Sequence, residues 1–385
     1  MLGNRSTIIS TELDAKVIKL KPSVSKTYSI EAILRSSYFL IISNSCEEYE
    51  FLMDFFLMNE ENALEELNKI FYSSIIFLTT ITETTLSECT DIICLLLSAS
   101  LFKRFNAILY NRSFNHLKNY LDIIIEKSWC RLCVVVNLYI ESIRSNDIPC
   151  GISYDQCHII TQQTSGLLSA LYGLISDFEP SKLALLFTQL VQEWSSFVSI
   201  EASVFDDRNM QLVFEIVNYN MVLNMINVQP HIPLIFKELR IEHIHEESIP
   251  ICNEIVNGFR KKYKNMIYQI CHDHLFQFFG DMIALIKNPK PKLQDGAHKA
   301  LTISINFTST WKNSLMVIST DLKKLFIKNY LDQELIEACF SIFIELYKEY
   351  SLLISNYYPE VMKQLNEKGK VVDIQNILIE MKKYR

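Results

Sequence analysis

Large apolar residues recur along most of the chain at intervals of three and four, the spacing that places side chains on one face of an α-helix. The stretch "FTSTWKNSLMVISTDLKKLF" at 307–326 carries one such stripe, formed by Phe307, Trp311, Leu315, Ile318, Leu322 and Leu325. The same spacing predicts helices over 29–57, 61–82, 84–110, 113–145, 154–177, 181–204, 208–228, 246–287, 295–328, 333–356 and 373–384. The pattern therefore predicts an all-α protein.

Turn-forming residues are scarce and stand between the predicted helices. The 385 residues include only 8 glycines and 9 prolines, and proline is accepted in loops and first helical turns but not in helix interiors. Several predicted helices are apolar on more than one side, which indicates neighbours on several faces, as in a multi-layer bundle. We expect an N-terminal arm at 1–28, a first helical bundle region at 29–205 and a C-terminal helical bundle region at 206–385.

The stripe at 307–326 could face the protein core, a partner or a membrane. Burying each of its large apolar side chains is worth about 1.5–3 kcal/mol, so we expect most of the stripe to be core. Trp311 should then be largely buried against the last long helix, near Phe340, Phe343 or Tyr347. The remaining face of the same helix carries the residues on which we expect a partner: Lys312, Lys323 and Lys324.

Charge and composition narrow the functional classes. The net charge is −7 and the 37 basic residues are spread along the chain, which argues against nucleic-acid binding. Ten cysteines and an N-terminus without an apolar signal region indicate a cytosolic protein. We find no convincing membrane span, because the uncharged run 70–82 is shorter than ~20 residues and the run 216–236 is rich in Asn and Pro. Any membrane association is expected to be indirect or peripheral.

Two groups of residues invite a chemical interpretation. The first group resembles half of a zinc site and comprises Cys130 and Cys133, followed by Cys150, Cys157 and His158. Cys130 and Cys133 lie in an apolar helical run, however, which favours two core cysteines one turn apart.

Asp206 and Asp207 resemble part of the aspartate-rich motif of all-helical prenyl-diphosphate enzymes. The third acid that such a motif needs is absent, and Asn209 and Met210 follow instead, so a helix cap accounts better for the pair. We predict no catalytic residue, no metal and no cofactor.

Whole segments of the sequence resemble the vacuolar protein sorting-associated protein 52 family. The similar segments occur in family order: "LRSSYFLIISNSCEEYEFLMDFF" (34–56), "ESIRSNDIP" (141–149), "YDQCHIITQQTSGLLSALYGL" (154–174), "NMQLVFEIVNYNMVLNMI" (209–226), the stretch at 307–326, "LIEACFSIFIELYKEYSLLI" and "DIQNILIEMKKYR". The Trp311-Lys312 pair also matches a Trp-Lys pair of the family. The collinear series, which covers nearly the whole chain, carries the resemblance.

The resemblance implies a subunit of the Golgi-associated retrograde protein complex and of its endosomal recycling relative. These multisubunit complexes tether endosome-derived vesicles at the trans-Golgi network and promote fusion. It also implies an elongated rod of stacked helical bundles, as in complexes associated with tethering containing helical rods. The implied partners are other subunits of the complex, a Golgi Rab GTPase and SNARE proteins, and the implied location is the cytoplasmic side of the trans-Golgi network and endosomes. Family members carry an N-terminal coiled coil, after which this chain is expected to start.

Two other functions remain open at this point. The chain could be a generic all-helical scaffold or adaptor unrelated to trafficking, or an all-α prenyl or lipid enzyme built around Asp206 and Asp207. A wide apolar cavity lined by several carboxylates would favour the enzyme.

Overall fold

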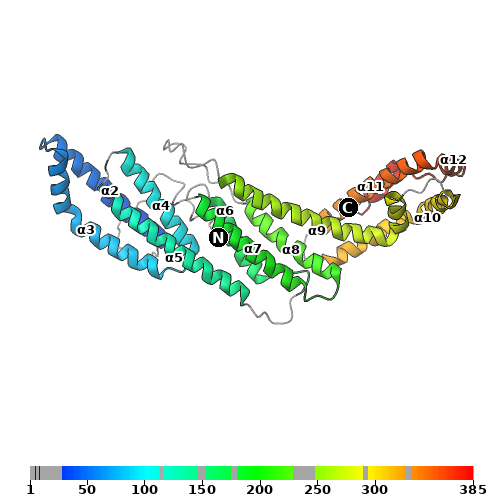
Figure 1. The fold of residues 1–385 in the computed structure, drawn as a ribbon, viewed down its shortest axis with the longest axis horizontal. Coiled ribbons are helices and arrows are strands. Elements are labelled where there is room, and N and C mark those ends of the chain that lie inside the picture. Colours follow the sequence, from blue (N-terminus) through cyan, green and yellow to red (C-terminus); the bar gives the residue numbers. More distant parts are fainter. Residues whose placement is uncertain are drawn as a thin grey trace. The chain divides into compact units, whose positions relative to one another are not determined.

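The computed structural model describes Arg5, Ile8 and residues 28–112, 114, 116–145, 153–174, 180–228, 248–288, 294–326 and 331–384 (Figure 1). All the long secondary-structure elements in these ranges are α-helices, and none of the described residues forms a β-strand. The prediction of an all-α protein is therefore confirmed for this part of the chain. Most of the predicted N-terminal arm at 1–28 lies outside the described residues.

Twelve α-helices lie in the described ranges. They are α2 (Ile30–Asp54), α3 (Glu60–Glu88), α4 (Ile92–Asn111), α5 (Lys118–Arg144), α6 (Ile159–Leu174), α7 (Pro180–Ala202), α8 (Arg208–Val228), α9 (Ser248–Lys287), α10 (Gln294–Leu325), α11 (Asp332–Tyr357), α12 (Pro359–Glu367) and α13 (Ile374–Met381). Each predicted helix has a counterpart among them, because the apolar spacing that predicts a helix is a local property of the sequence.

Helix ends differ from prediction in two places. The break expected near residue 83 falls at 89–91, because the Asp91 side chain caps α4 by accepting hydrogen bonds from the backbone N–H groups of Ile93 and Cys94 at 2.9 and 3.2 Å. The short helix α12 is absent from the prediction. It begins at Pro359, whose missing N–H costs nothing in a first helical turn.

The chain divides into two compact units. Unit 1 comprises Met1–Ile148, Ile159–Phe197 and Met221–Asn257, and unit 2 comprises Pro149–His158, Val198–Asn220 and Gly258–Arg385. Helices α7, α8 and α9 each contribute residues to both units. The predicted regions, divided after residues 28 and 205, stay a prediction.

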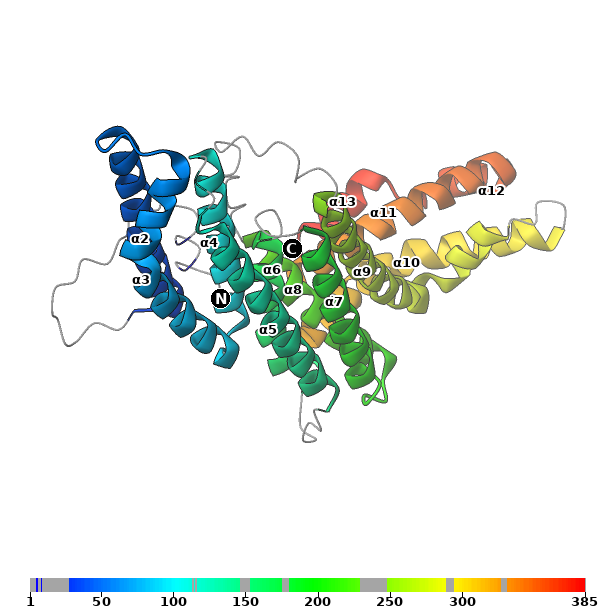
Figure 2. The same ribbon diagram turned by 60° about the vertical axis from the view of Figure 1, so that its left-hand side comes forward.

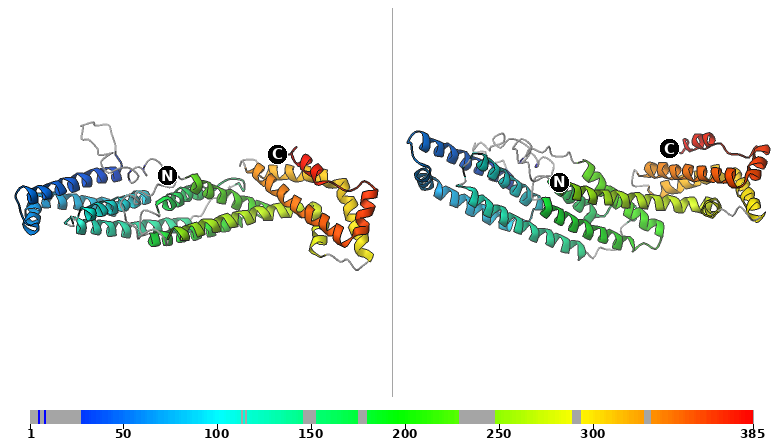
Figure 3. Two further views of the ribbon diagram at one scale, coloured as in Figure 1. Left: turned by 90° about the horizontal axis from the view of Figure 1, so that it is seen from above. Right: turned by 45° about the horizontal axis from the view of Figure 1, so that its top comes forward.

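Helices α2 to α5 lie side by side in unit 1, with α4 packed against α2, α5 and α6 (Figure 3). Helix α4 is long and apolar enough to cross a membrane, and it is the only helix of the described part that is. No convincing span is predicted from the sequence, and by length and composition α4 differs from that prediction. In the structure α4 is the central helix of this unit, since Leu96, Phe102 and Phe105 are fully buried. Its apolar residues face neighbours on several sides, as expected for a core helix.

Helices α9 to α13 supply most of unit 2, and their core is aromatic. Helix α9 departs from helical geometry at Phe279 (φ −122°, ψ 21°). The Phe279 ring lies 4.8 Å from the ring of Phe343 and 5.8 Å from the ring of Phe307, measured between ring centres. Helices α10 and α11 lie side by side, and α12 contacts both (Figure 2). This arrangement positions α10, the helix that carries the predicted interaction residues.

A buried asparagine joins α8 to the segment before α6 within unit 2. The Asn218 side chain is fully buried, accepts a hydrogen bond from the backbone N–H of His158 at 3.1 Å and donates one to the carbonyl of Phe214 at 2.8 Å. Residues 158 and 218 belong to two of the segments on which the family resemblance rests. The contact shows that these segments pack together.

Replacing Asn218 with leucine is expected to lower the free energy of unfolding by about 1–3 kcal/mol, because the buried N–H of His158 loses the side-chain oxygen that accepts from it. The change would appear as a lower urea midpoint in circular dichroism. Asn224→Leu is the matched control, since Asn224 lies on the same helix but is exposed. Equal shifts in the two variants would contradict the structural role of Asn218.

Candidate functional site

The stripe that the sequence predicts over 307–326 lies on α10 and faces the core of unit 2. Leu315, Ile318 and Leu322 are fully buried, Trp311 and Phe307 are nearly so, and Leu325 is half-buried. The expectation that most of the stripe is core is therefore confirmed. Burial on this scale leaves only the opposite face of α10 for a partner.

Helix α11 covers the first part of the stripe. The ring of Phe307 lies 5.1 Å from that of Tyr347 and 6.3 Å from that of Phe343. Phe307, one turn before Trp311, thus makes the ring contacts with α11 that were predicted for the tryptophan. The burial of Trp311 is as predicted, while its packing against Phe340, Phe343 or Tyr347 stays a prediction.

The three predicted interaction lysines are exposed on α10. Lys312 and Lys323 are eleven residues apart, which corresponds to about three helical turns and about 16 Å along the axis, so the two point the same way. Lys324 lies about 100° further round and its Nζ is 3.4 Å from Asp321. Lys312 and Lys323 therefore form a row of positive charge on the exposed face of α10, and Lys324 lies beside this row next to the carboxylate of Asp321.

The C-terminal helix α13 reaches the edge of this face. The pKa of Glu380 lies below its ordinary value because Lys383 donates a hydrogen bond to its carboxylate, and the positive charge of Lys312 adds to the effect. The ring of Tyr384 lies 6.4 Å from that of Phe340 on α11. Glu380 thus stays ionised near Lys312 and sets one boundary of the positive row.

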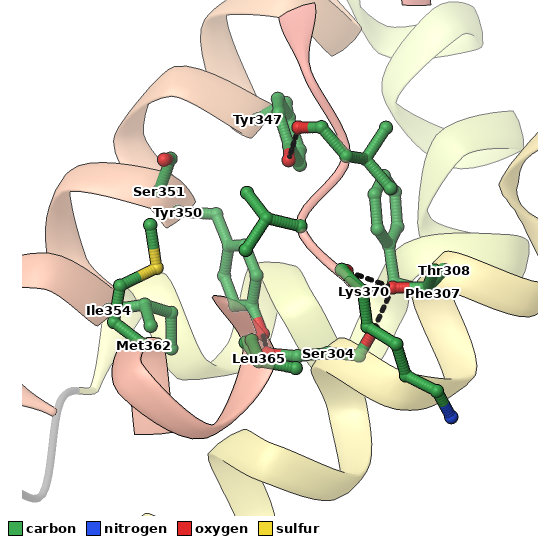
Figure 4. A pocket seen from close by; sticks show the side chains of 12 residues that line it. Ser304, Phe307, Thr308, Tyr347, Tyr350, Ser351, Ile354, Met362, Leu365 and Lys370 are labelled. Atoms are coloured by element: carbon green, nitrogen blue, oxygen red, sulfur yellow. Dashed lines mark hydrogen bonds between the residues drawn. The ribbon is translucent and has the colours of Figure 1, made fainter. Parts of the chain in front are cut away.

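A small cavity lies between α10, α11 and the segment after α12 (Figure 4). Its volume is about 30 Å³, which suits one water molecule, whereas pockets for small ligands measure about 300–1,000 Å³. The cavity is therefore too small to be a ligand site.

Hydrogen bonds around this cavity attach the segment after α12 to the two long helices. The Thr308 hydroxyl donates to the carbonyl of Lys370 at 2.8 Å, and the Tyr347 hydroxyl donates to that of Val372 at 2.5 Å. Tyr350 and Ser304 share a buried hydrogen bond of 2.7 Å. Burial raises the pKa of both tyrosines to about 12, so their hydroxyls stay protonated and can donate. The sequence prediction missed these residues, although Ser304 and Thr308 stand one turn apart beside the apolar stripe.

The cysteine pair on α5 is helical, as predicted, but the prediction that both are core cysteines is wrong. Cys130 is exposed, since it lines an open groove beside α3, and Cys133 is half-buried. His158 is buried, and Cys150 lies outside the described residues. Over the described ranges, no three His, Cys, Asp or Glu side chains come together in a way that could hold a metal ion.

The acidic pair before α8 acts as a helix cap. The Asp207 side chain accepts a hydrogen bond from the backbone N–H of Asn209 at 2.9 Å, and both aspartates are exposed. The predicted cap is thus confirmed at Asp207.

The groove between α3 and α5 has a volume of about 650 Å³ and two carboxylates in its lining, Glu83 and Glu126. Glu83 is ion-paired with Lys127 at 2.5 Å, and Arg131 also lines the groove. Basic side chains therefore balance the acids, unlike the carboxylate-lined apolar cavity that would favour a prenyl enzyme.

Comparison with known proteins gives a consistent set of relatives. The family profile described as "Vps52, C-terminal" matches residues 1–234. The chain is 25% identical over 398 residues to the vacuolar protein sorting-associated protein 52 homolog of Canis lupus familiaris, covering 100% of this chain and 52% of the relative.

More distant relatives match over the same extent. Identity is 21% to the homolog of Caenorhabditis elegans, and 22% to vacuolar protein sorting-associated protein 52 A of Arabidopsis thaliana. Both alignments cover 100% of this chain, and 54% and 53% of the relatives. The chain thus spans about half the length of the curated relatives that it matches.

Proposed function

Since this chain belongs to the Vps52 family, we propose that it is a non-catalytic subunit of a multisubunit vesicle-tethering complex. The transport step that we propose is retrograde, from endosomes to the trans-Golgi network, with the protein held peripherally on the cytoplasmic side of these membranes. The observation that carries the proposal is the alignment with relatives named for vacuolar protein sorting, which covers 100% of the chain.

The proposed mechanism is recognition by helix surfaces. The apolar face of α10 is taken up by the core of unit 2, and Lys312, Lys323 and Lys324 are charged residues on its exposed face that a partner could reach. A row of lysines favours an acidic helix or patch, because complementary charge increases the association rate and selects among partners. The proposed partners are other subunits of the tethering complex, a Golgi Rab GTPase and SNARE helices.

Charge reversal of the lysine row tests the proposal. The triple variant Lys312→Glu, Lys323→Glu, Lys324→Glu is expected to weaken binding of at least one of these partners tenfold or more. The measurement is co-purification of the full chain with subunits of the retrograde complex, a GTP-loaded Golgi Rab and trans-Golgi SNARE helices.

The matched control reverses three other exposed lysines of unit 2, Lys348, Lys363 and Lys368, and so makes the same change in net charge. Equal losses in both triple variants would contradict the assignment to α10 but leave the tethering function standing. Recovery of no retrograde-complex subunit and no trans-Golgi SNARE by the unaltered chain would contradict the tethering function itself. It would favour a scaffold unrelated to trafficking.

A further inference from the structure

The turn between α2 and α3 lies at one end of the hairpin that these two helices form (Figure 2). In this turn and the last turn of α2, four large apolar side chains within seven residues are exposed. Phe55 is 68% exposed and Leu57 is 84% exposed, with Phe51 and Phe56 about half exposed. Contiguous exposed apolar groups of this kind mark interaction sites more often than isolated ones do. We call residues 51–57 the aromatic tip.

The aromatic tip is ordered by contacts among its own rings. The rings of Phe51 and Phe55 stack at 5.0 Å, and the ring of Phe56 meets them edge-on at 5.6 and 5.0 Å. Leu57 has a left-handed backbone, with a φ of 55°, which is unfavourable for a bulky side chain. The left-handed backbone lets the chain turn after α2, where the backbone N–H of Met58 donates to the carbonyl of Leu52 at 3.4 Å. The exposure of the rings has no such structural role, and it is explained if the preformed cluster is covered by a partner.

The charged residues that flank the aromatic tip in α2 and at the start of α3 are all acidic. Residues 47–61 contain no Lys or Arg but six carboxylates: Glu47, Glu48, Glu50, Asp54, Glu60 and Glu61. Further along α3, Glu65 and Glu66 are paired with Lys69. Glu47, Phe51 and Phe55 follow each other at intervals of four and therefore lie along one face of α2. Glu50 and Asp54 form a second acidic row beside them. An acidic rim of this kind opposes binding to an anionic membrane surface.

We infer that the aromatic tip docks a basic amphipathic helix of a partner protein. The apolar stripe of that helix would cover Phe51, Phe55 and Phe56, and Lys or Arg residues on both sides of its stripe would face Glu47 and Asp54. Clustered aromatic anchors with charged groups at their rim are typical of protein interfaces. The inference does not depend on the proposed tethering function, because it follows from the exposure, geometry and charge of this turn alone.

The test uses the full chain and a designed, fluorescently labelled peptide of about 18 residues, or five helical turns, with Leu on one face and Lys on the other. Fluorescence anisotropy gives the dissociation constant. The double variant Phe55→Ser, Phe56→Ser is expected to bind at least tenfold more weakly. The matched control is Phe77→Ser, since Phe77 is also 68% exposed and lies on α3 of the same hairpin, in a stretch without acidic residues. That control is expected to bind as the unaltered chain does.

Reversing the acidic rim gives a second, independent readout. Glu47→Lys combined with Asp54→Lys is expected to weaken binding of the Lys peptide and to strengthen binding of a peptide with Glu in place of Lys. Equal binding of the Lys peptide by the Phe55/Phe56 and Phe77 variants would overturn the inference. So would binding to phosphatidylserine vesicles but not to the peptide, or a tip-dependent dimerisation of the chain without peptide binding.

Discussion

Replacing Phe343 with alanine is expected to lower the free energy of unfolding of unit 2 by about 3–5 kcal/mol, the usual cost of removing a buried phenylalanine ring. Phe343 is fully buried, and its ring lies 4.8 Å from that of Phe279, 6.3 Å from that of Phe307 and 6.5 Å from that of Tyr347. Alanine would leave a cavity where α9, α10 and α11 meet, because rings held by three helices cannot easily close the space.

The effect can be followed at Trp311, the tryptophan of this part of unit 2, by ¹⁹F NMR of protein labelled with 5-fluorotryptophan. In Phe343→Ala the Trp311 resonance should convert to its unfolded position at a lower urea concentration. Phe276→Ala is the matched control, since Phe276 lies on α9 but is 51% exposed. It is expected to change the free energy of unfolding by no more than about 0.5 kcal/mol. A shift in the control as large as that in Phe343→Ala would contradict the aromatic core described for this unit.

Replacing Arg5 with methionine is expected to destabilise unit 1 by about 1–3 kcal/mol at neutral pH, because it removes the cation from a partly buried ion pair and leaves the buried Glu31 carboxylate without this donor. The Arg5 guanidinium donates to the Glu31 carboxylate at 2.6 Å and to that of Asp91 at 2.8 Å. The Glu31 side chain is only 1% exposed, so it cannot turn to solvent when its partner is lost.

The pH dependence gives this prediction a specific signature. Burial acts to raise the pKa of Glu31, but the hydrogen bond and positive charge of Arg5, together with hydrogen bonds from the backbone of Glu31 and from Cys94, outweigh it, and the pKa lies below its ordinary value of 4.5. A lowered pKa means that the ion pair contributes stability above pH 4.5 and loses it as the pH falls through the folded-state pKa. Without Arg5, the strongest of the groups that lower this pKa is lost while burial still acts to raise it, and protonated Glu31 does not need the cation. The difference between the two proteins should therefore be largest near pH 7 and shrink below about pH 5.

Urea unfolding across this pH range measures the difference. Lys69→Met is the matched control, since its ion pairs with Glu65 and Glu66 at 3.3 and 2.8 Å are exposed on α3. Surface pairs of this kind contribute little to stability, because solvent screens the charges. A pH-independent loss in Arg5→Met would mean that lost packing, and not the ion pair, accounts for the destabilisation.

The sequence predicts much of the helical structure. The predictions that fail share one cause, which is that periodicity identifies a helix but not which of its sides other helices cover. The apolar stripe of α10 was predicted to be core, and it is buried. The exposure of Cys130 was not predicted, because periodicity places it in a helix without saying which side of α5 is covered. The same limitation applies to α4, whose composition alone also suits a membrane and whose neighbours explain its apolar sides.

Among the residues of the candidate site, some properties follow from helical periodicity and others depend on the tertiary structure. The exposure of Lys312, Lys323 and Lys324 follows from the helical period once the opposite face is assigned to the core. Thr308 and Tyr347 attach the segment after α12, but the sequence does not predict this role. Their hydroxyls donate to backbone carbonyls, and no sequence pattern identifies which carbonyl a hydroxyl will meet. The aromatic tip is also recognisable only in three dimensions, since phenylalanines in a sequence are usually assigned to a core.

By itself, the sequence determined the helices, the buried stripe and the family resemblance. Helix periodicity and apolar burial depend on residues within a few turns of each other, so they can be read without knowing the path of the chain. Only the tertiary structure decided which groups meet from distant positions, such as Arg5 with Asp91, 86 residues away, and Asn218 with His158, 60 residues away. Such contacts are set by how the helices pack, because any buried polar group must find its partner wherever the fold places one.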